Sequence, residues 1–176
     1  FKPVSDGMFS KMYFLLRNKL EEAGYLFYEV SNYALPGNEC NHNVHYWEGN
    51  EYVGLGAGAS GYLNNVRYSN EADVVHYIQS IQKNGRPEKT VDTMTPYKKW
   101  LEYVMLSLRT AKGLDTEILI ALYQENGWGK KNLETIERLE HFRKTGYLVK
   151  RGTVYSCTRR GFLMLDSLIH ELIPDE

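Results

Sequence analysis

The chain has 176 residues, of which 43% are hydrophobic and 24% charged, the balance of a globular protein with enough apolar side chains for a core. Its formal net charge of -1 gives no general attraction to nucleic acid or anionic lipid. Two cysteines are too few for a disulfide scaffold, so we expect a reducing, cytosolic compartment. Without an apolar run near roughly 20 residues, we expect neither a membrane span nor a signal peptide. Because the first residue is Phe1 rather than Met, we expect a fragment of a longer protein.

The first 40 residues predict a helix, a strand and a turn. Residues 5–25 predict the helix, with Ser5 or Asp6 as its cap. The run YLFYEVSNY, residues 25–33, is short and rich in aromatic and β-branched side chains, which predicts a strand. LPGNEC, residues 35–40, contains turn residues. The apolar stripe of this predicted helix consists of Met8, Met12, Leu15, Leu16 and Leu20.

The next segments suit the edge of an α/β layer. ECNHNVHYWEGNEY, residues 39–52, has no clear periodicity, whereas YVGLGAGASGYL, residues 52–63, is strand-like. Asn64 and Asn65 predict a turn before VRYSN, and a helix is expected over about 71–83. Its apolar face would contain Val74, Val75, Ile78 and Ile81.

The second half predicts a separate, mostly helical unit. The polar run over 84–95 is interpreted as a linker. Apolar stripes predict helices that start near Pro96, Asp115 and Asn132. A hairpin around 151–152 and a last helix follow, an order typical of a winged-helix-like unit. We therefore predict an α/β fold with one part over residues 1–90 and a helical part over 91–176.

Three glycines, Gly56, Gly58 and Gly61, spell the G-x-G-x-x-G pattern of a dinucleotide site. Such a site needs a helix directly after the glycines, so that its free N–H groups face the pyrophosphate. The segment that follows here predicts extended chain and a turn instead. We interpret the glycines as positions where the backbone passes close to a flat group or a packed neighbour.

The stretch around residue 45 combines Cys40, His42 and His45 with the rings of Tyr46 and Trp47. A structural zinc ion would need a fourth ligand, which the neighbouring sequence lacks. A haem iron needs only one axial imidazole or thiolate, and aromatic rings pack on a porphyrin. The residues themselves leave open a haem site and a polar loop with half-buried aromatic side chains.

The winged-helix-like unit also suggests a nucleic-acid-binding module. Its basic pairs are Lys130–Lys131, Arg143–Lys144, Lys150–Arg151 and Arg159–Arg160. The helix that would enter a groove, however, carries Glu134, Glu137 and Glu140, whose carboxylates repel phosphates. We favour a solvated face and expect no nucleic acid as partner.

Two segments, YEVSNYALPGNECNHNVHYW and YVGLGAGASGYL, resemble the C-terminal half of the oxygen-independent coproporphyrinogen III oxidase-like radical S-adenosylmethionine proteins. LRTAKGLD and TRRGFLMLD are similar to the small helical domain that ends such proteins. HNVHYW fits the H-N-x-x-Y-W pattern of the haem-chaperone (HemW) branch. The resemblance implies the C-terminal end of a partial TIM-type barrel over 1–90, followed by the winged-helix-like domain.

The same resemblance implies which residues bind haem. The H-N-x-x-Y-W pattern falls on His42, Asn43, Tyr46 and Trp47, with His42 as first candidate for the iron ligand. His45 and Cys40 are the alternative ligands.

The glycine-rich run has an implied role as well. Gly56, Gly58 and Ser60 would shape the floor of the barrel's open end. Many relatives have histidine where this chain has Ser60, so a role of that histidine is not carried over.

The cofactors of radical chemistry are implied only outside this chain. A [4Fe–4S] cluster that binds S-adenosylmethionine needs three cysteines in a C-x-x-x-C-x-x-C motif, and Cys40 and Cys157 are far apart. The cluster would belong to an N-terminal barrel half, a partner of this chain, without which the chain should be inactive as an enzyme. We expect a cytosolic haem chaperone that reaches the membrane only through a membrane-bound acceptor enzyme. The alternative within the family is a true coproporphyrinogen III oxidase, which forms protoporphyrinogen IX by oxidative decarboxylation.

Overall fold

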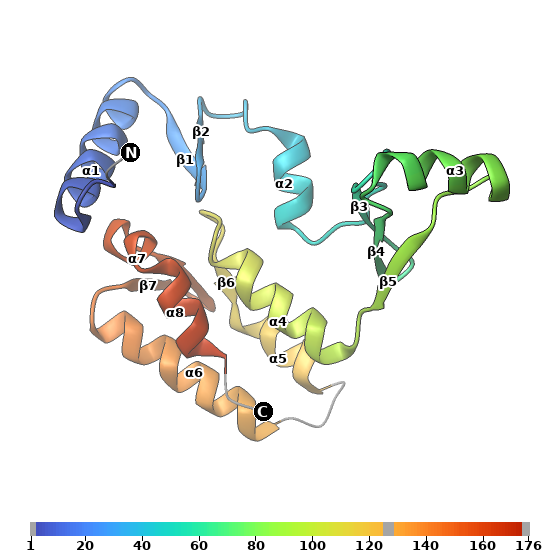
Figure 1. Ribbon diagram of the computed structural model, residues 1–176. Helices are drawn as coiled ribbons and strands as arrows, with labels where there is room; N and C mark the ends of the chain where they lie inside the picture. The colour runs from blue at the N-terminus through green and yellow to red at the C-terminus, as the bar shows by residue number, and fades with distance from the viewer. Residues whose placement is uncertain (1–2, 125–128, 174–176) are drawn as a thin grey trace.

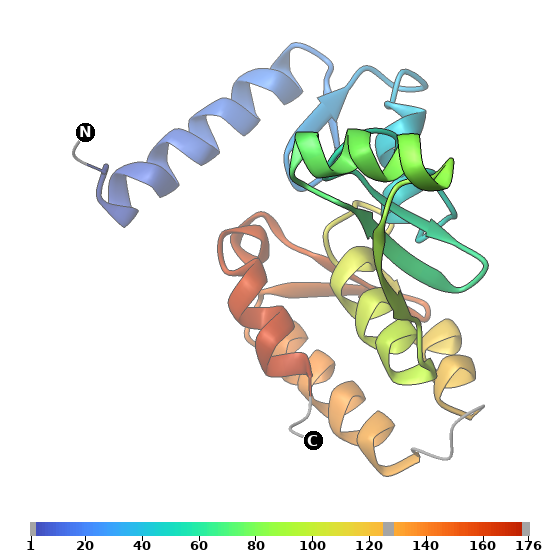
Figure 2. The same cartoon turned by 45° about the vertical axis from the view of Figure 1, so that its right-hand side comes forward.

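The computed structural model describes residues 3–124 and 129–173, and Figures 1 and 2 show their arrangement. The first part contains α1 (Asp6–Glu22), β1 (Leu26–Glu29), β2 (Asn32–Ala34), α2 (Asn41–Trp47), β3 (Ser60–Leu63), β4 (Val66–Asn70), α3 (Val74–Asn84) and β5 (Lys89–Thr93). The second contains α4 (Pro96–Ser107), β6 (Leu114–Asp115), α5 (Thr116–Gln124), α6 (Gly129–Lys144), β7 (Leu148–Arg151), β8 (Val154–Cys157), α7 (Arg159–Leu163) and α8 (Leu165–Leu172). The predicted mixture of helices and strands is therefore confirmed.

The second part is built around α4, which supplies the centre of the main hydrophobic core. Trp100, Val104 and Leu108 are fully buried, because a spacing of four residues places them on one helix face. Other elements complete the core with Leu114, Leu119, Leu139, Phe142, Leu148, Tyr155, Leu165, Leu168, Ile169 and Leu172. The antiparallel sheet β6-β8-β7 covers one side. The predicted order of helices, hairpin and final helix is confirmed, with β6 added and the final helix divided at Met164.

The predicted strand over residues 25–33 is instead a hairpin of β1 and β2. Leu26 pairs with Ala34, and the chain reverses directly after Glu29. The Glu29 carboxylate is buried and accepts hydrogen bonds from the Ser31 N–H (3.1 Å) and the Asn32 side chain. A carboxylate that accepts hydrogen bonds from the residues directly after it stabilises a turn at that point. The prediction of one continuous strand over residues 25–33 was therefore wrong.

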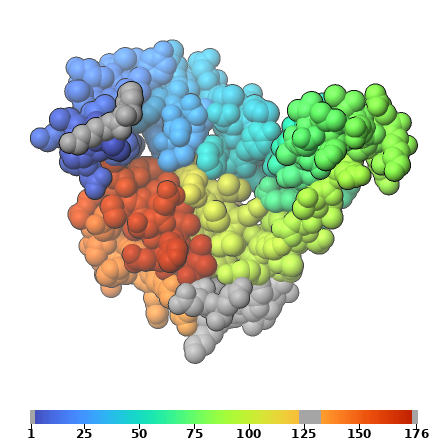
Figure 3. Space-filling view, viewed as in Figure 1, coloured from blue at the N-terminus to red at the C-terminus, as the bar shows by residue number. Residues whose placement is uncertain are grey.

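The predicted linker contains a strand that completes a second sheet. β5 pairs with β4 along its whole length, so the linker prediction was wrong for these residues, and the predicted boundary after residue 90 falls inside β5. The predicted turn at Asn64 and Asn65 is confirmed. Both have positive φ angles, 49° and 65°, as a two-residue β-hairpin requires. Sheet β3-β4-β5 and α3 form an arm that projects from the body (Figure 3).

Two predicted amphipathic helices, α1 and α3, leave their apolar faces exposed. Ser5 caps α1 as predicted, but none of its residues is buried (Figure 2). α1 is held through polar side chains, because Arg159 donates to Asn18 (2.7 Å) and Arg17 lies over the Phe27 ring (4.7 Å). The exposed apolar side chains are Met8, Phe9, Met12, Leu15 and Leu16 on α1, and Val74, Val75, Ile78 and Ile81 on α3.

Candidate functional site around helix α2

The H-N-x-x-Y-W stretch forms the seven-residue helix α2, with Cys40 as its N-cap residue. The sequence showed no clear periodicity there, and the polar-loop interpretation is wrong. The helix ends at Trp47 with Glu48 as its C-cap residue, and Gly49 follows with a φ of 69°, the left-handed conformation that commonly terminates helices. The Glu48 and Gly49 N–H groups donate to the carbonyls of Val44 and Tyr46. α2 is thus a short, well-terminated element.

One face of α2 carries a row of rings. His42 and Tyr46 lie one turn apart, with ring centroids 4.8 Å apart and an interplanar angle of 89°. Tyr46 in turn packs edge-on against Tyr52, at 4.5 Å. Tyr52 is fixed by two backbone hydrogen bonds of 2.8 Å to Tyr62 of β3. The exposed imidazole of His42 therefore stands against a chain of aromatic contacts that reaches the sheet.

The other predicted haem contacts are distributed differently. His45 Nε2 lies 2.8 Å from the carbonyl oxygen of Glu51, so this imidazole is engaged with the segment after the helix. Cys40 is exposed at the start of the helix, and Asn43 is half-buried. Trp47 is half-buried and does not join the ring row, because it lies on the opposite side of the helix against a cavity.

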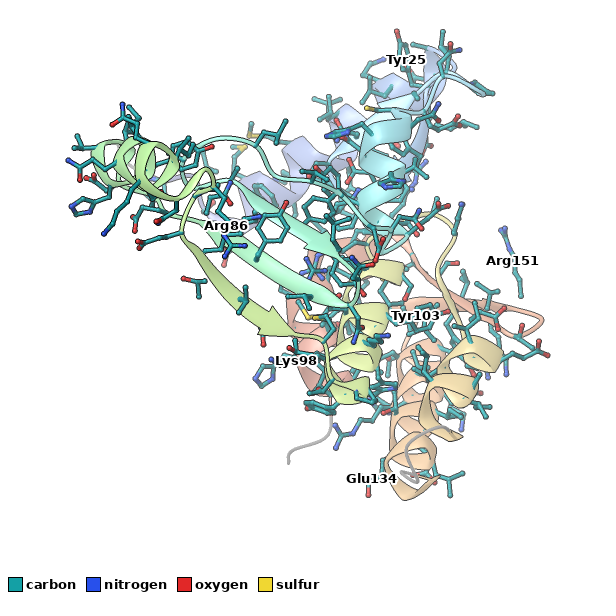
Figure 4. The ribbon with its side chains drawn as sticks, turned by 90° about the vertical axis from the view of Figure 1, so that its right-hand side faces the viewer. Tyr25, Arg86, Lys98, Tyr103, Glu134 and Arg151 are labelled. Carbon is teal, nitrogen blue, oxygen red and sulfur yellow. The ribbon has the colours of Figure 1, made fainter. Side chains whose placement is uncertain are left out.

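This α2–α4 cavity has a volume of about 910 Å³ and lies between α2, β1, α4 and the loop that leads to β6. Val44 and Trp47 of α2 form part of one wall, and Tyr103 and Leu106 of α4 part of the other. In Figure 4, Tyr103 lies near the centre of the molecule, between the first part and the helical part. α2 thus separates two surfaces, the ring row with His42 and the cavity with Trp47.

The glycine-rich run lies outside this cavity. Gly56 and Gly58 have positive φ angles of 103° and 69°, and the Ser60 hydroxyl is 2.9 Å from that of Ser69. A Cβ at Gly61 would come within 2.3 Å of the Tyr68 ring, so this glycine permits close packing, as interpreted. The run leads into strand β3, which contains Gly61, and no helix opens on these glycines, as the sequence predicted.

Four ion pairs join the described residues of the first part to the helical part, and two of them lie beside α2 and its neighbouring sheet. Arg67 of β4 donates two hydrogen bonds to Glu102 of α4 (2.6 and 2.8 Å) and a third to the Tyr52 hydroxyl (3.1 Å). The hydrogen bonds to Glu102 raise the pKa of Arg67. Lys112 pairs with Glu48 at the end of α2 and lowers the pKa of that carboxyl. The pairs of Arg67 and Lys112 could not be predicted from the sequence, because their partners lie 35 and 64 residues away.

Within the described part of the chain, no three His, Cys, Asp or Glu side chains are grouped as a metal site. Burial raises the pKa of the Cys157 thiol to about 12, so it stays protonated. A haem iron needs only one axial donor, and the exposed imidazole of His42 fits that need. None of the described helices has the length and apolar character to cross a membrane.

The basic pairs of the second part are partly neutralised on their own surface. Arg143 on α6 donates to Glu140 at 2.6–2.9 Å, and Arg159 is engaged with α1. This agrees with the solvated-face interpretation. The side chains of Lys130 and Lys131 lie outside the described residues.

Comparisons with known proteins find relatives that match up to 96% of this chain. No protein-family model matches it. It is 39% identical to the heme chaperone HemW of Lactococcus lactis over 113 residues, 64% of this chain and 29% of that protein. It is 30% identical to HemW of Mycobacterium tuberculosis over 168 residues, 96% of this chain and 40% of that protein.

A solved structure shares the fold. The coproporphyrinogen III oxidase (HemN) of Escherichia coli, a radical SAM enzyme, matches 90% of this chain and 39% of its own length with a TM-score of 0.68 and 17% identity. The chain therefore spans about two fifths, or less, of the proteins named here. These relatives show that the chain belongs to the oxygen-independent coproporphyrinogen III oxidase-like radical S-adenosylmethionine family, in its HemW branch.

Proposed function

We propose that this chain is the haem-binding part of a haem chaperone, with His42 as the axial ligand of the iron. The observation that carries the proposal is the exposed imidazole of His42, held edge-on against Tyr46 on the surface of α2. The relatives named HemW support the class of ligand. When bound, haem supplies an iron that one imidazole nitrogen can coordinate.

The surroundings of His42 favour it over the alternative ligands. His45 would have to release the Glu51 carbonyl before its Nε2 could bind a metal. The Cys40 thiol is exposed but precedes the helix, so it lacks the ring contacts that orient His42. Tyr46 would offer its ring to the porphyrin beside His42, with Asn43 as a polar neighbour. Trp47, on the other side of α2, would contact only a group that enters the cavity.

In the full protein, we propose that residues 1–90 form the end of a partial barrel and residues 91–176 a winged-helix-like domain. The exposed apolar faces of α1 and α3 would then pack against the N-terminal barrel half. That half would bind the [4Fe–4S] cluster and S-adenosylmethionine. Haem bound near α2 would pass to a membrane-bound acceptor enzyme, from a chaperone that is itself cytosolic.

A haem titration of the 176-residue chain tests the proposal. Hemin should give a Soret band that His42→Ala weakens by about tenfold or more in apparent affinity, a loss of about 1.4 kcal/mol. The matched control is His76→Ala, which removes another exposed imidazole, from α3. An unchanged spectrum in His42→Ala would remove His42 as ligand, and Cys40→Ala and His45→Ala would then identify the donor.

A further inference from the structure

The α2–α4 cavity is not explained by the proposed haem ligand, because His42 lies on the opposite side of α2. Its volume of about 910 Å³ falls within the range of about 300–1,000 Å³ typical of small-molecule sites. Backbone contacts fix its walls, because the Ala111 N–H donates to the Tyr28 carbonyl (3.0 Å) and Glu29 forms a β-bridge with Thr110. The cavity is therefore a preformed feature between β1 and the loop after α4.

Aromatic side chains form much of the cavity lining. They come from β1, α2, β3 and α4, and are Phe27, Tyr28, Trp47, Tyr62 and Tyr103. The Tyr103 hydroxyl donates to the Asp115 carbonyl (3.1 Å) and accepts from the Asp115 N–H (2.9 Å), which holds this ring in the wall. Val44, Leu106 and Val154 add aliphatic surface. The walls can therefore enclose an apolar body and offer ring faces to it.

Two of these rings already bind a cation of the protein. The Arg67 guanidinium lies 5.0 Å from the centroid of the Tyr62 ring, and the Arg17 guanidinium lies 4.7 Å from that of Phe27. The Trp47 indole has no cation or ring partner among the described residues. Indole is the aromatic side chain to which cations bind best. A cation that enters the cavity therefore finds the Trp47 ring available.

The charged side chains make the lining negative. Four carboxylates face two ammonium groups, so the lining has a formal charge of -2. These side chains are Glu39, Glu48, Glu102 and Asp115 against Lys99 and Lys112. The carboxylates come from the segment before α2, the C-cap of α2, α4 and β6, and are thus distributed over several walls. A concave surface with an excess of one charge raises the local concentration of the opposite ion.

Ion pairs within the chain leave the sign of this charge unchanged. Glu48 pairs with Lys112, and both belong to the lining. Glu102 pairs with Arg67, which lies outside the lining. The cavity therefore remains negative even when the Arg67 guanidinium is counted with it.

Two carboxylates of the lining have no cation partner among the described residues. Glu39 accepts only the Gly37 N–H (3.4 Å), and the Asp115 carboxylate only the Glu117 N–H (2.9 Å). Lys99, which is exposed, is the ammonium group of the described lining that forms no ion pair. Removal of that ammonium group would make the cavity more negative still.

We propose that the α2–α4 cavity binds an organic cation, a protonated amine or quaternary ammonium group on an apolar, ring-bearing body. The cationic group packs on the Trp47 ring, and the apolar body packs against the aliphatic walls. The excess of carboxylates in the lining attracts the ligand. The inference does not depend on the haem proposal, which uses the other side of α2.

Other classes of ligand use fewer features of this lining. No histidine or cysteine is among the described residues that line the cavity, so a transition-metal ion lacks its usual donors. An anion or a zwitterion brings a negative group, which the excess of carboxylates repels. A neutral apolar molecule gains only from the walls. An organic cation uses the apolar walls, the free Trp47 ring and the charge together.

Three small molecules of similar size and different charge test the proposal. Benzyltrimethylammonium is the cation, benzyl methyl sulfone the neutral molecule and benzylsulfonate the anion. Each is titrated into the 176-residue chain by calorimetry, while NMR of the isotope-labelled chain records the Trp47 indole N–H signal. The cation should bind with a Kd of about 1 mM or lower and shift that signal. Benzylsulfonate should bind about tenfold more weakly or not at all, and the sulfone should lie between the two.

A pair of matched lysine variants tests the role of charge. Lys99→Gln removes the unpaired ammonium group of the lining and should strengthen binding of the cation by about twofold or more. Lys83→Gln makes the same change at an exposed position of α3, at the outer end of the arm, and should leave binding unchanged (Figure 1). A gain in affinity cannot result from a damaged fold.

Trp47→Leu tests the role of the ring. It keeps an apolar side chain but removes the indole, and should weaken binding of the cation by about threefold to thirtyfold. Circular dichroism checks that this variant folds. His42→Ala removes a ring from the other side of α2 and should leave binding of the cation unchanged.

The proposal is overturned if the chain does not bind the cation, or if the sulfone or the sulfonate binds equally well. It is also overturned if Lys99→Gln gains no more affinity than Lys83→Gln, if folded Trp47→Leu binds the cation like the parent, or if His42→Ala weakens binding as much as Trp47→Leu. The hemin titration of His42→Ala tests the haem proposal separately, so either proposal can fail while the other stands.

Discussion

The ion pair between Arg67 and Glu102 is expected to hold the β3-β4-β5 arm on the helical part. Two parallel hydrogen bonds of 2.6 and 2.8 Å join the guanidinium to the carboxylate, and both side chains are about 30% exposed. Glu102→Gln keeps the shape of the side chain but removes its charge and one acceptor. Hydrogen bonds to charged groups contribute about 1.5–3 kcal/mol, and partial exposure lowers this to about 1–2 kcal/mol here. The unpaired Arg67 also loses the main cause of its raised pKa.

Thermal and urea unfolding measure this effect. For a chain of this size, Glu102→Gln should lower the melting temperature by about 2–8 °C. The matched control is Asp92→Asn, which removes an ion pair with Lys98 that also joins the arm to α4 but is more exposed, at 41% and 55%. That pair should contribute less than about 1 kcal/mol. If both variants lost the same stability, the bidentate geometry of Arg67 would have no special role.

Two further predictions concern titratable groups. Lys112 lowers the pKa of Glu48 below 4.5, so Lys112→Ala should lose the full stability of the ion pair above that pH. The loss should disappear as the pH falls through the lowered pKa, which melting temperatures measured against pH would show. A loss of stability that does not depend on pH would contradict the ion pair. In the folded chain, the exposed Cys40 should react with iodoacetamide. The buried Cys157, whose pKa is about 12, should react only after unfolding. Equal labelling of the two cysteines in the folded chain, measured by mass spectrometry, would contradict this prediction.

Local sequence signals predicted the elements whose own residues determine them. The helix α4 follows from its apolar stripe, although the stripe did not identify Trp100 as part of the buried face. The turn between β3 and β4 follows from two asparagines that tolerate positive φ angles. β5 was missed because KTVDT is mostly polar and every residue of this edge strand is exposed. Its pairing with β4 is determined by backbone hydrogen bonds, which leave no hydrophobic pattern in the sequence.

The candidate site was only partly predictable for a related reason. The sequence identified the residues of α2, but not that they form a helix. Seven residues make only about two helical turns, which is too short a segment for an apolar repeat to be recognised. Without the helix, the H-N-x-x-Y-W residues looked like one cluster. The cavity was invisible, because its walls come from β1, α2, α4 and β8, which only the folded chain brings together.

The helical geometry of α2 also changes how the H-N-x-x-Y-W pattern is interpreted. At about 100° per residue, positions four apart share a face, whereas positions five apart lie on opposite sides. His42 and Tyr46 therefore form one surface, and Trp47, the next residue, belongs to the other. The tryptophan at the end of the pattern therefore lines the wall of the α2–α4 cavity, and the histidine at its start lies on the surface of the ring row. The two ends of the pattern face different surroundings, so substitutions at His42 and at Trp47 test different surfaces of α2.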